Sequence, residues 1–120
     1  MELGCARIIG RQLSYDCSGC NEAINSAEAV RAALLDAVRR ANVTLLQIVL
    51  QEFEPQGITA VAIIAESHVI IHTWPEHGFV TLDVFTCGDR PLPEQAVNAV
   101  REAFAPSHIE AKELVRGKAR

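Results

Sequence analysis

The amino-acid sequence predicts an α+β fold, a two-layer sandwich in which a mainly antiparallel β-sheet carries two helices on one face. Two segments repeat their apolar residues at three- and four-residue steps, as helices do, and strand-like segments rich in β-formers outnumber them. Most of those strands fall between the two helices in the sequence. The 120 residues show no linker or internal repeat, so we expect a single domain, residues 1–120.

Helical periodicity covers two ranges, 25–41 and 93–104. In the first range Asn25 and Glu28 resemble a capping box, and arginines stand in the last turn. In the second range Pro93 suits the first position of a helix, and Pro106 bars its continuation. Both helices are therefore expected to end close to the limits of the periodic pattern.

The other segments are predicted to be strands. Residues 58–64 are apolar on both faces, whereas the longer segments around them alternate or are simply rich in β-formers. Glycines and prolines between the segments predict turns. The predicted strands are 6–15, 43–53, 58–64, 68–74, 79–86 and a short one near 108–115.

Composition and charge narrow the class of protein. The chain is 49% hydrophobic with a formal net charge of -4, which argues against disorder and against a nucleic-acid or anionic-membrane partner. No apolar run reaches the roughly 18 residues of a membrane span, and the N-terminus lacks the pattern of a signal peptide. We therefore expect a cytoplasmic protein.

Four cysteines stand at positions 5, 17, 20 and 87. Without a signal for export, they are expected to be thiols rather than disulfides. Cys17 and Cys20 form a lone C-x-x-C pair, but no second pair supplies the further ligands of a zinc site. We therefore expect no metal.

One face of the predicted sheet carries an unusual mixture of side chains. Because side chains alternate along a strand, Leu46, Ile48 and Leu50 should face the helices. A solvated opposite face would carry Lys, Glu and Thr. Instead it would collect aromatics, histidines, an acid and a thiol, which indicates a ligand site, a subunit interface or both. Its members are Gln47, Gln51, Phe53, His68, Ile70, His72, Trp74, Phe79, Thr81, Asp83, Phe85 and Cys87.

Most of these residues belong to two neighbouring motifs. Taken singly, a strand histidine, a Trp or a lone Cys usually has a structural role. Together, however, residues 66–78 have the sequence ESHVIIHTWPEHG, and FTCG follows at 85–88. This pattern closely resembles the bacterial and archaeal S-adenosylmethionine decarboxylase family, which carries E-S-H-x-x-I-H-T-W-P-E and F-T-C-G at this separation. Phe53-x-Pro55-Gln56-Gly57 and the order of helices and strands are also similar, so the resemblance spans nearly the whole chain.

The resemblance implies a proenzyme that cuts its own peptide bond between Glu66 and Ser67. The Ser67 hydroxyl would attack the carbonyl of Glu66, and elimination and hydrolysis would leave a pyruvoyl group at the N-terminus of residues 67–120. Residues 1–66 would form the other chain. The implied reaction is the decarboxylation of S-adenosylmethionine, which gives the aminopropyl donor for spermidine synthesis.

Decarboxylation of an amino acid needs an electron sink, and the sequence offers no site for pyridoxal phosphate. The two lysines, Lys112 and Lys118, lie in a polar C-terminal segment, and no Gly-rich phosphate cradle is present. We therefore expect no pyridoxal phosphate. A ketone made from Ser67 can itself bond to the substrate amine and withdraw the electrons.

The resemblance also assigns catalytic and processing roles. His72 matches a histidine that takes a proton during processing, and Cys87 a cysteine that protonates the carbanion after CO2 leaves. Thr59 stands where the family often has Ser as a processing hydroxyl, and it keeps the oxygen. Simple alternation puts Ser67 on the core side with Val69, so the backbone must turn or bulge for the reactive group to reach His72 and Cys87.

For substrate binding, the resemblance implies that Phe53 stacks on adenine and that Glu76 hydrogen-bonds the ribose hydroxyls. Trp74 would either add an apolar side chain to the lining of the substrate site or have only a structural packing role. One departure lies nearby, because Gln51-Glu52 stands where the family often has a His followed by a basic residue.

The leading prediction is thus a pyruvoyl-dependent S-adenosylmethionine decarboxylase that works as a homodimer of processed protomers, with sites near the subunit interface. One alternative keeps the chemistry and decarboxylates arginine or ornithine. A second alternative is a non-enzymatic α+β binding module in which the motif survives as packing.

Overall fold

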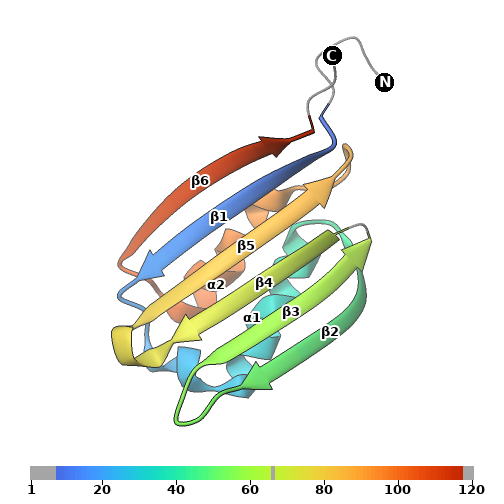
Figure 1. Ribbon diagram of the computed structural model, residues 1–120. Helices are drawn as coiled ribbons and strands as arrows, with labels where there is room; N and C mark the ends of the chain where they lie inside the picture. Colours follow the sequence, from blue (N-terminus) through green and yellow to red (C-terminus); the bar gives the residue numbers. More distant parts are fainter. Residues whose placement is uncertain (1–7, 66, 118–120) are drawn as a thin grey trace.

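The structure is a computed structural model that describes residues 8–65 and 67–117. It contains one six-stranded antiparallel sheet with strand order β2-β3-β4-β5-β1-β6 (Figure 1). Both α-helices lie behind this sheet in Figure 1, on one face. The predicted two-layer α+β sandwich is therefore confirmed.

The helices and strands follow the predicted order closely. The strands are β1 (Gly10–Ser18), β2 (Thr44–Glu52), β3 (Ile58–Ala65), β4 (Ser67–Trp74), β5 (Phe79–Cys87) and β6 (His108–Arg116). The helices are α1 (Ala27–Arg40) and α2 (Val97–Phe104), with 3-10 turns η1 (Glu22–Asn25), η2 (Pro75–His77) and η3 (Pro93–Gln95).

The N-terminus of α1 differs from the predicted capping box. Ser26 is the N-cap, and its side chain accepts a hydrogen bond from the backbone N–H of Ala29. Asn25 instead ends the preceding turn η1. A serine one position later serves the same purpose, because either side chain can satisfy a free N–H of the first turn.

The core lies between the sheet and the two helices. Fully buried residues from α1, α2 and the central strands pack together there, among them Leu34, Phe104, Ile71 and Leu82. This packing leaves the opposite face of the sheet without a covering layer among the described residues (Figure 1). That open face carries exposed apolar side chains, including Val49 at 47% and Ile63 at 41% of full exposure.

The assignment of Leu46 to the helix side was wrong. The register of β2 against β3 shifts between Leu45 and Gln47, so Leu46 is an extra residue and is 64% exposed. Ile48 and Leu50, beyond the shift, pack against the core as predicted. A bulge of one residue inverts the alternation on one side of it, which strand parity alone cannot reveal.

No helix among the described residues is long and apolar enough to cross a membrane.

Cys17 is completely buried near the end of β1. Its pKa is raised from 9.0 to about 12, mainly by burial and to a smaller extent by the nearby Cys20. Cys5 lies outside the described residues.

We predict that Cys17 resists alkylation in the folded protein. At pH 8 a pKa of about 12 leaves about 1,000-fold less thiolate than the unfolded chain would have. Because the folded pKa is the higher one, Cys17 leaves the free energy of unfolding unchanged below pH 9 and lowers it as the pH rises from 9 towards 12. Mass spectrometry after iodoacetamide treatment, with and without urea, measures the effect. Equal labelling of Cys17 in both conditions would contradict it.

Candidate active site

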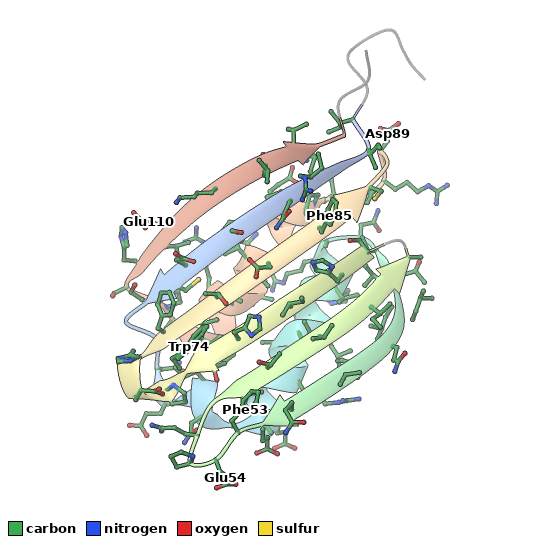
Figure 2. The ribbon with its side chains drawn as sticks, in the orientation of Figure 1. Phe53, Glu54, Trp74, Phe85, Asp89 and Glu110 are labelled. Atoms are coloured by element: carbon green, nitrogen blue, oxygen red, sulfur yellow. The ribbon has the colours of Figure 1, made fainter. Side chains whose placement is uncertain are left out.

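A pocket of about 230 Å³ opens at the end of the sheet where β2 meets β3 and β4 meets η2. Its walls combine aromatic and polar side chains from parts of the chain that are distant in sequence. Figure 2 shows Phe53 and Trp74 at this end of the molecule. The lining residues are Phe53, Gln56, Gly57, Ile58, Thr59, His72, Thr73, Trp74 and Glu76.

Two tight turns shape this pocket. The loop between β2 and β3 is closed by a hydrogen bond of 2.8 Å from the Phe53 N–H to the Gly57 carbonyl. Gly57 has φ of 106°, a conformation that strongly favours glycine. On the other side, η2 ends at Gly78 with φ of 58° and carries Glu76 beside Trp74. The turns thus present Phe53 and Glu76 at one opening.

His72 and Thr59 form the polar pair of the pocket. They are paired residues on β4 and β3, and the Thr59 Oγ1 lies 3.0 Å from His72 Nδ1. This hydrogen bond fixes the plane of the imidazole and leaves Nε2 as the other ring nitrogen, which is able to exchange a proton with a bound molecule. The pair can therefore act as an oriented acid or base.

The aromatic residues form a partly exposed cluster. The Trp74 ring lies 6.0 Å from the His72 ring and 5.6 Å from the Phe79 ring, measured between centroids. Phe53 is 50% exposed and Trp74 is 38% exposed. Exposed rings that line a pocket can stack on a flat aromatic ligand.

Ser67 and Cys87 lie at the opposite end of the sheet. Ser67 begins β4, is half-buried and pairs with Ile64 of β3. Cys87 ends β5, two residues beyond Phe85, which pairs with His68. Glu66, the other half of the predicted cleavage site, lies outside the described residues.

A second pocket, of about 410 Å³, adjoins this end. Its lining includes Cys87 and Ala65, together with the polar residues Asn42, Thr44, Asp89 and Arg90. The Asn42 side-chain amide donates to the Arg90 carbonyl at 3.1 Å and ties the two loops of the pocket together. Sequence reasoning attached no role to these loop residues, because only the fold brings 42–44 beside 87–91.

The predicted site residues therefore fall into two groups on one protomer. Thr59, His72, Phe53, Trp74 and Glu76 share the first pocket, whereas Ser67 and Cys87 lie at the other end. His72 is five residue steps along β4 from Ser67, which is about 17 Å at the usual rise of a strand. Figure 2 shows the same division, with Phe53 and Trp74 at one end and Asp89, which follows Cys87, at the other.

Ser67 keeps the parity expected from simple alternation. No register shift occurs between β3 and β4 or between β4 and β5 among the described residues. The turn or bulge was expected at Glu66–Ser67, and Glu66 lies outside the described residues; from Ser67 onwards β4 pairs regularly with β3 and, from His68, with β5. Within one protomer, these two residues do not meet.

Gln56 also lines the first pocket, together with Glu76, although its motif in the sequence predicted no role for it. Its position between Pro55 and Gly57, in a motif that also holds Phe53, was the available signal. Among the described residues, no group of three or more His, Cys, Asp or Glu side chains is arranged to hold a metal ion.

Comparison with known proteins points in one direction. A family model described as S-adenosylmethionine decarboxylase matches residues 11–117. A protein of Acidithiobacillus ferrooxidans named S-adenosylmethionine decarboxylase proenzyme is 41% identical over 113 residues, covering 93% of this chain and 85% of its own. A proenzyme of the same name from Methanococcus vannielii is 37% identical over 110 residues, covering 91% and 90% of the two chains.

A solved structure agrees with these relatives. The crystal structure of the adenosylmethionine decarboxylase from Aquifex aeolicus superposes with a TM-score of 0.88 at 35% sequence identity. The match covers 96% of each chain. The similarity therefore extends to the whole sheet and both helices.

Proposed function

The chain belongs to the S-adenosylmethionine decarboxylase family, and we propose that it decarboxylates S-adenosylmethionine through a pyruvoyl group made from its own Ser67. The observation that carries this proposal is the agreement of family, fold and motif over residues 11–117. Arginine, ornithine and a non-enzymatic role are not favoured, because the related proteins are named for S-adenosylmethionine.

The surroundings of Ser67 fit a pyruvoyl group. Ser67 is half-buried at the start of a strand, and a thiol-lined pocket adjoins the same end of the sheet. The Cβ, Cα and carbonyl carbon of a serine residue are the three carbon atoms that such a group needs, so no separate cofactor site is required. When present, the group supplies an electron sink that bonds to the substrate amine.

The group would arise by cleavage of the precursor between residues 66 and 67. The Ser67 Oγ attacks the carbonyl carbon of Glu66, and the amide becomes an ester with a free amine at residue 67. Loss of the Cα proton then breaks the Cβ–O bond and releases Glu66 as a carboxylate. Addition of water and loss of ammonia complete the ketone. The products are residues 1–66 and 67–120.

Two protomers would share each site. The distance of about 17 Å along β4 prevents His72 from serving Ser67 of its own chain. A two-fold axis between two open faces, running across the strands, would set the Ser67 end of one protomer over the His72 end of its partner. Covering the open face would also bury exposed apolar side chains such as Val49 and Ile63. We therefore propose a homodimer with two composite sites.

In such a site the first pocket would bind the adenosyl part of the substrate. Phe53 and Trp74 offer exposed rings for the adenine, and the Glu76 carboxylate can accept hydrogen bonds from the ribose hydroxyls. His72, held by Thr59, would take the proton during processing. Arginine and ornithine have neither a base nor a ribose for these residues.

Cys87 would return a proton to the carbon from which CO2 has left. We predict that Cys87→Ala lowers kcat about 100-fold or more, the usual range for loss of a general acid. A misplaced proton should also convert part of the enzyme to an inactive transaminated form, visible as a change in the mass of the 67–120 fragment. Normal kinetics with no modified fragment would remove Cys87 from the mechanism.

A carbon dioxide release assay tests the proposed function directly. Carboxyl-labelled S-adenosylmethionine, ornithine and arginine are compared as substrates for the purified protein. We expect release from S-adenosylmethionine alone. Release from either amino acid in its place would overturn the substrate assignment, and no release from any of the three would overturn the proposed activity.

A further inference from the structure

The polar side chains that line the first pocket differ in what they can offer a ligand. Thr59 and His72 are hydrogen-bonded to each other, and the Thr73 hydroxyl accepts from the Ile58 N–H at 3.0 Å. Glu76 is a carboxylate and can only accept hydrogen bonds when ionised. Gln56 alone among these lining side chains carries a donor and an acceptor side by side in one planar group.

The Gln56 amide is also available for a ligand. Among the described residues it has no hydrogen-bond partner, and the side chain is exposed. The short loop that holds it is closed by the bond from Phe53 to Gly57, so Gln56 and Phe53 are fixed to the same turn. One turn of chain therefore places an aromatic residue and an amide residue in the lining of the same pocket.

Adenine needs this combination of groups. Its ring offers a flat surface for stacking, and its 6-amino donor stands beside the N7 acceptor. A glutamine amide pairs with these two atoms through two hydrogen bonds, as it does in the major groove of DNA. A carboxylate such as Glu76 would meet the N7 lone pair with another acceptor, so it suits the ribose hydroxyls instead.

We propose that Gln56 is a specificity-determining residue that reads the N6/N7 edge of the adenine, while Phe53 supports its face. This inference rests on the proposed function, because it presumes that the first pocket holds the adenosyl group. The amide N–H donates to N7, and the amide oxygen accepts from the 6-amino group.

Kinetics with an altered base tests this pairing. The 7-deaza analogue of S-adenosylmethionine replaces N7 by a C–H and keeps the amino group and the shape. We expect the unmodified enzyme to prefer S-adenosylmethionine over this analogue about 10-fold in kcat/KM. Gln56→Ala should abolish the preference, because it loses two hydrogen bonds to the natural substrate and only the one from the 6-amino group to the analogue. Gln56→Glu keeps the acceptor and loses the donor, so it should show the same loss of preference.

The matched control is Gln95→Ala, because Gln95 is an exposed glutamine that bonds Asn98 on the helix side of the molecule. It should retain both the activity and the preference. A preference that survives in Gln56→Ala, or that is missing from the unmodified enzyme, would overturn the assignment. So would a loss of activity in Gln56→Ala that is equal for both substrates, since that would indicate mere support of the loop.

A binding measurement separates this inference from the proposed function. Calorimetry compares adenosine with 7-deazaadenosine on the purified full-length protein, unmodified and Gln56→Ala. If the protein binds adenosine in preference through Gln56 but releases no CO2, the pairing stands and the proposed activity fails. If CO2 is released but the unmodified protein and Gln56→Ala show the same preference, both between the two substrates and between adenosine and 7-deazaadenosine, the activity stands and the role of Gln56 fails.

Discussion

Ser67→Ala is expected to leave the chain uncut and to reduce decarboxylation to background. The methyl group of alanine has no oxygen to attack the preceding carbonyl, so neither the new N-terminus nor the electron sink can form. The variant should migrate as one chain of 13.1 kDa, whereas the unmodified protein should give two fragments. Denaturing electrophoresis and the CO2 release assay measure the two effects.

The fold should tolerate this change, because Ser67 is half-buried and its side chain has no hydrogen bond to another described residue. Its thermal unfolding should therefore remain close to that of the unmodified protein. Ser18→Ala removes a hydroxyl at the end of β1, away from both pockets, and should be cut and active. Cleavage of the Ser67→Ala chain at the same bond would refute Ser67 as the nucleophile.

Mixed dimers of Ser67→Ala and Glu76→Ala should recover activity that neither variant has alone. Glu76→Ala removes a charged hydrogen-bond acceptor and should lower kcat/KM about 10- to 100-fold while leaving cleavage intact. In a mixed dimer, one site would combine the processed Ser67 of the Glu76→Ala protomer with the intact Glu76 of the other. That site would be complete, whereas the second site would carry both defects.

Tandem affinity tags isolate the mixed dimer after co-expression. With one complete site out of two, its activity should reach about half that of the unmodified dimer. If each protomer instead built its site alone, the mixed dimer would be no more active than the Glu76→Ala protein. The separation of Ser67 from His72 along β4 favours the first outcome.

The fold was largely predictable because its elements carry clear local patterns. The apolar repeat of α1 and the turn glycines and prolines predicted each element to within a few residues. Leu46 was wrongly predicted to face the helices, and the error had a physical cause. An extra residue between Leu45 and Gln47 inverts the alternation of side chains. Nothing in a run of β-formers distinguishes a straight strand from a bulged one.

The candidate site was predictable as a set of residues but not as an arrangement. The motif around residues 66–78 and 85–88 named the chemical groups, and pairing across the sheet brought Thr59 to His72. Whether Ser67 meets His72 depends on how straight β4 is, which is a property of the whole sheet. Gln56 was hidden for a related reason, because only the folded loop shows that it lines the same pocket as Glu76.

Intact-mass analysis of freshly purified, folded protein tests most directly whether the chain cuts itself and forms a pyruvoyl group from Ser67. We expect two chains whose sequences divide between residues 66 and 67, with the second blocked to Edman degradation and trapped by borohydride. A single intact chain in a preparation that actively releases CO2 from S-adenosylmethionine would contradict the account.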